Sequence, residues 1–545
     1  MSFNLADVFE LAVDTYPDRE YLVADGKRCT YRQMDERANQ LAHHLATQGI
    51  GKGDHVGIYA CNSIEWVETV WAVFKLRAVW ININYRYVED ELAYIFKNAD
   101  LKALVVAQEF VPRTLNVIHS LPMLSHIMVI HDDSDAAAPI PARNHLTVVD
   151  YHSAVAKQSA LRDFAPRSND DIYMLYTGGT TGMPKGVIWR HEDVFFALGG
   201  GIDLTTGEVA KEPMDVVKRG AAYQLTMYPL APLMHGASQW AVMGRAFEGH
   251  KIVLSAKFDA EQTWRTIATE KVNGVFITGD AMARPLIEAF EKLKGTLDLS
   301  AFFILASSAV VFSQSLKDQF LEHFPNLMIL DSIGSSETGG GGLIAATKGM
   351  EMKGGPTVKP TQGSTILDPD TLTPLKPGTG QIGLVARSGF IPLGYFKDEK
   401  KSAETFIKGG DGIRYSIPGD SGILEADGSI TLLGRGSQCI NSGGEKIFPE
   451  EVDSAVKTHP NVYDVTVVGV PDERWGSTVC AIIQIRKGHK APTLESIQDH
   501  CRSLIAGYKI PRKLVVVDSI LRAPSGKPDY RWAKDTAYTA LNIQA

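Results

Sequence analysis

The chain of 545 residues is too long for a single hydrophobic core, so its length predicts at least two domains. An apolar content of 44% and a charged content of 22% are typical of a globular protein. The net charge of −8 and the lack of any run of Lys or Arg argue against a nucleic-acid-binding protein.

Helical patterns open the chain. Apolar residues recur at helical spacing in Met1–Asp14 and in Tyr31–Gln48, where Gly49 follows as the expected C-terminal cap. Met1–Asp14 lacks a basic start and a long apolar core, so we interpret it as an amphipathic helix and not as a signal peptide. Charged residues interrupt the apolar region Ile64–Ile83, which argues against a transmembrane span.

Short apolar runs alternate with helical stretches, and this alternation predicts α/β units with parallel strands. The expected strands are His55–Tyr59, Leu104–Ala107, Lys251–Leu254, Gly274–Thr278 and Phe302–Leu305. The polar, mixed-charge stretch Gly201–Gly220 is interpreted as a surface insertion.

A glycine- and threonine-rich segment, YTGGTTGMPKG over residues 176–186, joins two further expected strands, Ile172–Tyr176 and Val187–Trp189. Its glycines let backbone N–H groups approach an anion, its threonine hydroxyls add donors, and Lys185 adds a positive charge. It differs from a P-loop because Pro184 precedes the lysine and a strand follows. The segment is predicted to hold phosphate groups, and a plain Gly/Thr-rich hairpin is the alternative.

A new pattern begins at Ile440, after a stretch rich in glycine and aspartate. We expect helices at Pro449–Thr458 and Leu494–Ile505, and strands at Val462–Val470, Val479–Ile485 and Lys513–Val517. The predicted fold class is therefore α/β, with a large N-terminal domain of mixed sheets and helices (1–436) and a small C-terminal α/β domain (437–545).

Five segments, in order, resemble the motifs of the adenylate-forming superfamily, which comprises acyl-CoA synthetases, peptide-synthetase adenylation domains and beetle luciferases. They are residues 176–186, Asp331–Thr338 (DSIGSSET), Tyr415–Asp420 (YSIPGD), Gly434–Arg435 with Ile440–Val452, and Pro524–Lys527 (PSGK). The resemblance covers nearly the whole chain. It implies that a carboxylate attacks the α-phosphate of ATP, that pyrophosphate leaves, and that CoA then takes over the acyl group as a thioester.

The resemblance implies that residues from all of these motifs bind the nucleotide. It implies that Lys185, Glu337 and Lys527 are catalytic and that Glu337 supplies an oxygen ligand to Mg²⁺, with a helix-capping Glu as the alternative. Asp420 and Arg435 are expected to hold the ribose hydroxyls, with a surface ion pair as the alternative. The whole set expected to bind ATP is Thr177, Gly178, Gly179, Thr180, Thr181, Gly182, Lys185, Ser308, Asp331, Ser335, Ser336, Asp420, Arg435 and Lys527.

The resemblance also implies that the small domain is mobile. In one state Lys527 enters the site and neutralises charge between the carboxylate and the α-phosphate. The domain then rotates about a hinge at Gln438, where the family normally has Asp or Lys, and withdraws Lys527. The rotated domain is expected to line a channel for the pantetheine arm of CoA with Ser442, Gly443 and Gly444.

The acyl pocket is expected beside His235, Gly236, Asp280 and Ala281. The first two lie in a segment similar to the family motif P-L-x-H-x-x-G, and a satisfied core histidine is the alternative for His235. The other two lie in Gly279–Pro285, which is similar to actinobacterial synthetases that activate sterol side-chain carboxylates.

We therefore expect a cytoplasmic, AMP-forming acid–thiol ligase that uses ATP, Mg²⁺ and CoA to activate a bulky apolar carboxylic acid, namely a steroid side-chain carboxylate. A medium- or long-chain fatty acyl-CoA synthetase is the main alternative. A peptide-synthetase adenylation module would need a pocket acid for the ammonium of its substrate. An inactive binding protein would be expected to lack Lys527 or Glu337, and no sequence feature calls for a luciferase-like oxygenase.

The scattered, odd-numbered cysteines indicate reduced thiols, in keeping with a cytoplasmic location. No nucleic-acid partner and no membrane span are expected, and a homodimer is left open.

Overall fold

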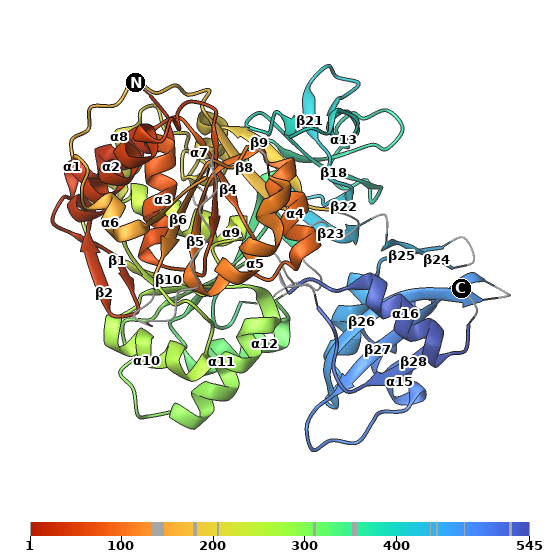
Figure 1. The fold of residues 1–545 in the computed structure, drawn as a ribbon. Helices are drawn as coiled ribbons and strands as arrows, with labels where there is room; N and C mark the ends of the chain where they lie inside the picture. The colour runs from red at the N-terminus through yellow and green to blue at the C-terminus, as the bar shows by residue number, and fades with distance from the viewer. Residues whose placement is uncertain are drawn as a thin grey trace.

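The computed structural model describes residues 2–121, 123–131, 146–177, 183–203, 206–308, 312–350, 357–435, 438–442, 445–472, 475–522 and 526–543. A large N-terminal domain, coloured red to cyan in Figure 1, lies beside a smaller blue C-terminal domain. The predicted boundary at residues 436 and 437 lies outside the described residues and stays a prediction.

A long sheet runs through the N-terminal domain. In spatial order its strands are β2 (Lys27–Thr30), β1 (Glu20–Ala24), β11 (Lys251–Leu254), β10 (Thr226–Pro229), β12 (Gly274–Ile277), β13 (Ile304–Ser308), β14 (Met328–Ser335), β15 (Gly339–Ala346), β16 (Thr357–Pro360), β23 (Ile430–Arg435), β22 (Asp420–Leu424), β18 (Ile382–Ser388), β21 (Arg414–Ser416) and β20 (Phe406–Lys408), with β17 (Ser364–Leu367) beside β18. Within this sheet, the neighbouring strands β1, β11, β10, β12, β13 and β14 pair in parallel. The next pair, β14 and β15, is antiparallel.

Two further sheets complete the N-terminal domain. A parallel sheet has the order β4 (Val79–Asn82), β3 (His55–Tyr59), β5 (Leu101–Ala107), β6 (His126–Ile130) and β7 (Thr147–Asp150). An antiparallel sheet has the order β19 (Gly394–Tyr395), β9 (Lys185–Arg190) and β8 (Ile172–Thr177). The parallel pairs confirm the α/β units expected from the alternation of strands and helices.

The helices of the N-terminal domain cover these sheets (Figure 1). They are α1 (Leu5–Thr15), α2 (Tyr31–Thr47), α3 (Ile64–Lys75), α4 (Glu89–Asn98), α5 (Val111–Val117), α6 (Tyr151–Val155), α7 (His191–Leu198), α8 (Pro213–Val217), α9 (Gly236–Phe247), α10 (Ala260–Glu270), α11 (Gly279–Leu293), α12 (Gln314–His323) and α13 (Glu399–Thr405). A capping box between Thr30 and Gln33 starts α2, and Gly49 follows it with φ of +74°, which confirms the predicted cap. Helices α10, α11 and α12 pack their apolar faces against β10 to β14.

Two sequence predictions need correction. The strand expected at Phe302–Leu305 begins later, at Ile304, and Phe302 is buried as a core residue before it. The stretch Gly201–Gly220 lies only partly on the surface: Val209 is 40% exposed, but α8 buries Val216 and Val217, and Tyr16 donates a hydrogen bond of 2.9 Å to the Val217 carbonyl. The polar residues of the stretch concealed this short apolar run.

The C-terminal domain is a small α/β unit. Its elements are β24 (Ile440–Ser442), β25 (Glu445–Ile447), α14 (Pro449–Lys457), β26 (Val462–Asp472), β27 (Gly476–Ile485), α15 (Leu494–Arg502), β28 (Lys513–Val517) and α16 (Tyr530–Ala540). The order of α14, β26, β27, α15 and β28 confirms the predicted order, whereas α16 was not predicted. α14 and α15 pack into one hydrophobic cluster with β26 and β27, and α16 packs into another. Among the described residues, every helix is too short or too polar to cross a membrane.

Candidate active site

The β8–β9 hairpin carries the predicted phosphate-binding segment, and its strands pair Thr177 with Lys185. Gly178, Gly179, Thr180, Thr181 and Gly182, at its tip, lie outside the described residues. Asn82, at the end of β4, accepts a hydrogen bond of 2.8 Å from the Tyr176 N–H and donates to the carbonyls of Tyr176 and Met234. Asn82 therefore fixes the end of β8 to the segment that precedes His235.

Lys185 lies at the start of β9 and forms an ion pair with Asp398. Asp398 also caps α13 by accepting a hydrogen bond of 2.9 Å from the Lys401 N–H. The Lys185 ammonium lowers the pKa of the Asp398 carboxyl below its ordinary value. This pair holds the lysine at the base of the hairpin.

The predicted metal ligand Glu337 lies in the turn between β14 and β15, and neighbouring side chains hold this turn in place. The Tyr395 hydroxyl donates a hydrogen bond of 2.9 Å to Glu337 Oε1, and the Ser416 hydroxyl donates one of 2.7 Å to the Glu337 carbonyl. The indole N–H of Trp189, on β9, donates one of 3.0 Å to the Ser336 carbonyl. The structure thus brings Glu337 next to the β9 strand that carries Lys185.

The buried guanidinium of Arg387 also holds the turn between β14 and β15. Arg387, on β18, is 2% exposed and donates hydrogen bonds to the carbonyls of Thr338 and Gly340. Burial lowers the pKa of Arg387 to about 10. Within the turn, the Ser335 hydroxyl lies 3.0 Å from the Thr338 hydroxyl. Ser335 thus takes part in the turn itself.

Two residues of the set expected to bind ATP, Ser308 and Asp331, lie on the adjacent parallel strands β13 and β14. Ser308 ends β13 and pairs with Ser332 of β14, next to Asp331. Lys317 Nζ lies 2.7 Å from Asp331 Oδ2, while burial raises the pKa of Asp331 above its ordinary value. Carboxyl ends of parallel strands are the usual place for a ligand crevice in open α/β sheets.

The residues expected near the ribose lie on neighbouring strands. Asp420 begins β22 and lies opposite Arg435 of β23 in the strand register. The two backbones are therefore adjacent, but the side chain of Arg435 lies outside the described residues, and the contact with the ribose stays a prediction.

His235 caps α9, and its Nε2 is buried without a hydrogen-bond partner among the described residues. Burial, together with the positive charges of Arg86 and Lys527, lowers its pKa to about 4. The imidazole is therefore neutral at neutral pH, and Lys527 lies close enough for its charge to act on it. A Cβ on Gly236 would lie 2.5 Å from Leu175 Cδ2, so only glycine fits here without movement.

The other two residues predicted for the acyl pocket lie at the start of α11. Ala281 is exposed. Asp280 uses both carboxylate oxygens: Oδ1 accepts a hydrogen bond of 2.7 Å from the Ser313 N–H, and Oδ2 lies 3.0 Å from Lys457 Nζ of the C-terminal domain. Their part in the acyl pocket stays a prediction.

The predicted residues of the C-terminal domain are only partly described. Gln438 and Lys527 are half-buried, and Ser442 is buried on β24. Gly443 and Gly444 lie outside the described residues. The hinge and the CoA channel therefore stay predictions.

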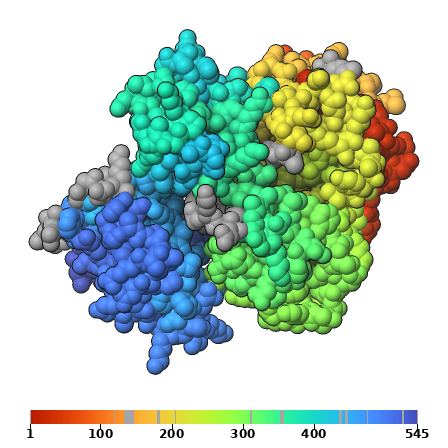
Figure 2. Space-filling view, turned by 180° about the vertical axis from the view of Figure 1, so that it is seen from behind, coloured from red at the N-terminus to blue at the C-terminus, as the bar shows by residue number. Residues whose placement is uncertain are grey.

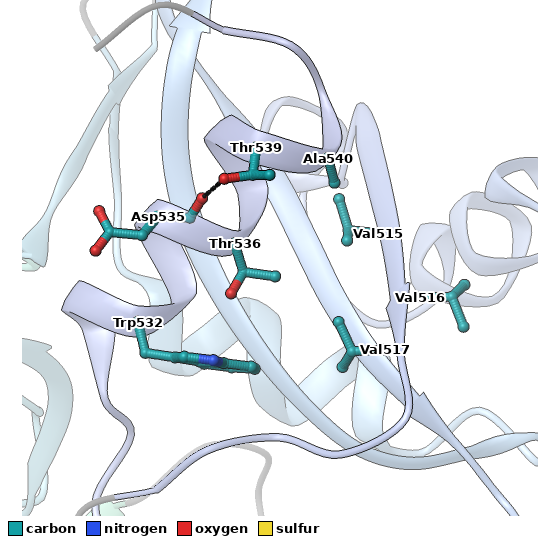
Figure 3. Close-up of a pocket in the computed structure, with 8 residues that line it drawn as sticks. All are labelled: Val515, Val516, Val517, Trp532, Asp535, Thr536, Thr539 and Ala540. Atoms are coloured by element: carbon teal, nitrogen blue, oxygen red, sulfur yellow. Dashed lines mark hydrogen bonds between the residues drawn. The ribbon is translucent and has the colours of Figure 1, made fainter.

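A hollow of about 420 Å³ lies elsewhere, between β28 and α16 (Figure 3). It is lined by Val515, Val516, Val517, Trp532, Asp535, Thr536, Thr539 and Ala540. The Thr539 hydroxyl donates a hydrogen bond of 2.8 Å to the Asp535 carbonyl. None of the predicted site residues lines this hollow.

Sequence reasoning missed Asn82, Arg387, Tyr395 and Asp398, which hold the predicted residues in place. Asp398 precedes a helical stretch, a pattern that indicates a helix cap but not an ion pair with Lys185. The other three belong to none of the quoted motifs, and no local pattern in the sequence distinguishes them.

Comparisons with known proteins agree with this arrangement. The AMP-binding enzyme family matches residues 9–396, and the AMP-binding enzyme C-terminal domain matches residues 451–527. The chain is 51% identical over 540 residues to the 3-oxocholest-4-en-26-oate–CoA ligase of Rhodococcus rhodochrous, over 98% of the chain and 96% of the relative. It is 48% identical over 536 residues to the medium/long-chain-fatty-acid–CoA/3-oxocholest-4-en-26-oate–CoA ligase of Mycobacterium tuberculosis, with the same coverage.

Among solved structures, the anthranilate CoA ligase AuaEII in complex with anthranoyl-AMP superimposes with a TM-score of 0.82 at 25% identity. The superposition covers 99% of this chain and 98% of that one.

Proposed function

The chain belongs to the AMP-binding enzyme family, and we propose that it joins the side-chain carboxylate of a 3-oxosteroid to CoA through an acyl-adenylate. It is an acid–thiol ligase with ATP and CoA as substrates. The observation that carries the steroid proposal is the 51% identity, over 98% of the chain, to a ligase named for 3-oxocholest-4-en-26-oate.

The region of His235 favours an apolar acid. Its imidazole is neutral at neutral pH because burial lowers its pKa to about 4. The buried apolar side chains of Met234 and Leu175 lie beside this segment. Such surroundings stabilise a hydrocarbon body and leave the ammonium of an amino acid without a counter-charge.

In the proposed adenylation step, Lys185 and the loop that precedes it hold the β- and γ-phosphates. Lys527 neutralises the charge that gathers between the carboxylate and the α-phosphate. The carboxylate of Glu337 fits a hard cation, because Oε1 is oriented by Tyr395 and Oε2 has no hydrogen bond within the described residues. Bound there, Mg²⁺ would neutralise phosphate charge.

The described residues hold no group of three or more His, Cys, Asp or Glu side chains placed to bind a metal ion by themselves. We therefore expect Glu337 to share Mg²⁺ with the phosphates of ATP. For the ribose and for CoA we propose the remaining predicted residues, namely Asp420, Arg435, Gln438, Ser442, Gly443 and Gly444.

We further propose a reducing, cytoplasmic environment, because Cys29, Cys61, Cys480 and Cys501 carry thiols that form no disulfide.

The test is a comparison of kcat/KM for 3-oxocholest-4-en-26-oate, palmitate, octanoate and acetate. Each buried methylene contributes about 0.8 kcal/mol, or roughly fourfold in kcat/KM, so the values should rise steeply with apolar size. We expect the steroid acid to give the highest value. A maximum at palmitate would support the second candidate, a fatty acyl-CoA synthetase, which the name of the M. tuberculosis relative also favours. A maximum at acetate would contradict both.

A further inference from the structure

The two domains meet at one face of α11. Asp280 and Arg284 lie one helical turn apart on this helix and both contact the C-terminal domain. Lys457 Nζ, at the end of α14, lies 3.0 Å from Asp280 Oδ2, and the Arg284 guanidinium lies 4.9 Å from the ring centroid of Tyr463. In Figure 2 the blue C-terminal domain lies beside the green part of the N-terminal domain.

Lys457 makes a second ion pair within its own domain. Its Nζ lies 3.1 Å from Asp464 Oδ1, at the start of β26. Arg522 holds both oxygens of the same carboxylate, with Nη2 at 2.6 Å from Oδ1 and Nε at 2.7 Å from Oδ2. Burial would raise the pKa of Asp464, but its pairs with Arg522 and Lys457 lower the pKa to about 2. Asp464 thus links Lys457 to Arg522.

Arg522 stands at the beginning of the segment that carries Lys527. It forms a β-bridge with Pro528, and its Nη1 lies 3.4 Å from the Gly526 carbonyl oxygen. At the other end of the segment, the Tyr530 hydroxyl donates a hydrogen bond of 3.0 Å to Glu450 Oε1 on α14. The segment with Lys527 is therefore attached at both ends to the elements that carry Lys457 and Asp464.

We propose that Lys457 is a positioning residue for acyl-adenylate formation, because its ion pairs with Asp280 and Asp464 hold the Lys527 segment toward the N-terminal domain. Lys457 acts through Lys527. When the C-terminal domain rotates, the Lys457–Asp280 contact must break, whereas the pair with Asp464 lies within one domain and travels with it. Lys457 is therefore needed for the first half-reaction and not for the second. The inference rests on the proposed acyl-adenylate route.

The ion pair is well placed for this role. The side chains of Lys457 and Asp280 are 13% and 5% exposed, so their attraction is screened little by solvent. Removing the Lys457 charge takes the 3.0 Å ion pair from the buried Asp280 carboxylate, which keeps a longer-range attraction to Arg522, and so weakens the contact between the domains. Displacement of a catalytic group by about 1 Å can cost about 100-fold in rate.

The experiment measures the two half-reactions of the full-length enzyme separately. Acid-dependent exchange of pyrophosphate into ATP reports the first, and thioester formation from supplied acyl-adenylate and CoA reports the second. For Lys457→Gln we expect the first rate to fall about 10- to 100-fold and the second to stay within about twofold of the wild type. Lys457→Arg keeps the charge and should recover most of the first rate.

A matched control uses an ion pair inside the C-terminal domain. Lys509 Nζ lies 2.6 Å from Glu451 Oε1 on α14, and its side chain is 17% exposed. Lys509→Gln removes a comparable pair without touching the domain contact, and should leave both half-reactions unchanged. A similar loss in the control and in Lys457→Gln, or equal losses in both half-reactions, would overturn the proposal.

Asp280→Asn removes the N-terminal-domain partner of the Lys457–Asp280 ion pair. It also provides a test of the proposal if Lys457→Gln does not fold. It keeps an oxygen for the Ser313 N–H but removes the charge that Lys457 meets. The same selective loss of the first half-reaction, and no additional loss when Asp280→Asn is combined with Lys457→Gln, support the proposal. Additive losses in the double variant, or equal losses in both half-reactions of Asp280→Asn, would overturn it. If the wild type shows no exchange at all, the acyl-adenylate route itself is wrong, which is a separate result.

Discussion

At the scale of single residues, Tyr395 links the two predicted catalytic side chains of the N-terminal domain. Its hydroxyl donates to Glu337, and its ring centroid lies 6.0 Å from Lys185 Nζ. Lys185 in turn pairs with Asp398. The Lys185 ammonium and the Glu337 carboxylate, predicted to bind phosphate and a divalent cation, therefore both lie beside the Tyr395 side chain.

Replacing Glu337 by Gln should test the carboxylate without disturbing this arrangement. The amide oxygen can still accept the Tyr395 hydrogen bond, so we expect the thermal unfolding temperature to change little. ATP use at limiting Mg²⁺ should fall about 10- to 100-fold, a loss typical of weakened metal sites. The measurement is the pyrophosphate-exchange rate as a function of Mg²⁺ concentration. An unchanged Mg²⁺ dependence would remove Glu337 from the metal site.

At the scale of elements, the β14–β15 hairpin and the β8–β9 hairpin carry the described residues predicted for the phosphates and the metal ion. Trp189, on β9, donates to the turn of the other hairpin, and buried Arg387 holds that turn from β18. Trp189 and Arg387, which lie outside the quoted motifs, therefore hold the turn of the β14–β15 hairpin next to the β8–β9 hairpin. Precise placement of this kind is what phosphoryl-type displacement needs.

The short helix α8 offers a stability test at this scale. Val217 is fully buried, and Val217→Ala should lower the free energy of unfolding by about 2 kcal/mol through lost burial and a cavity. Val209, in the same stretch, is 40% exposed, and Val209→Ala should change the free energy by less than about 0.5 kcal/mol. Denaturant unfolding compares the two variants, and equal small effects would restore the interpretation as a surface insertion.

At the scale of the whole molecule, the C-terminal domain lies with Lys527 close enough to His235 to influence its pKa. Asp280 and Arg284 supply contacts between the domains. This arrangement fits the adenylation state of the domain alternation that the superfamily resemblance implies. The alternation itself requires these contacts to open between half-reactions.

Lys527→Ala is the whole-molecule prediction. In the proposed mechanism the Lys527 charge stabilises only the first transition state, so acyl-adenylate formation should fall about 100- to 1000-fold, as when one oriented donor is lost. Thioester formation from supplied acyl-adenylate should stay close to that of the wild type. Rapid-quench measurement of both half-reactions checks this, and equal losses would count against domain alternation.

The sequence by itself determined the local chemistry. The positions of most strands, the cap at Gly49 and the order of elements in the C-terminal domain followed from spacing and turn residues, which are properties of short segments. The motifs also predicted the residues of the nucleotide site; the structure places two of them, Lys185 and Glu337, beside Tyr395, and their roles stay predictions.

Only the tertiary structure decided which side chains from distant segments meet. The pairs Lys185–Asp398 and Asp280–Lys457 and the burial of α8 depend on how sheets, helices and domains pack. Asp398 shows the difference: its cap of α13 is readable from neighbouring residues, but its partner Lys185 arrives through the pairing of β9 with β19. Charge attraction and burial act through space, so residue spacing along the chain cannot specify them.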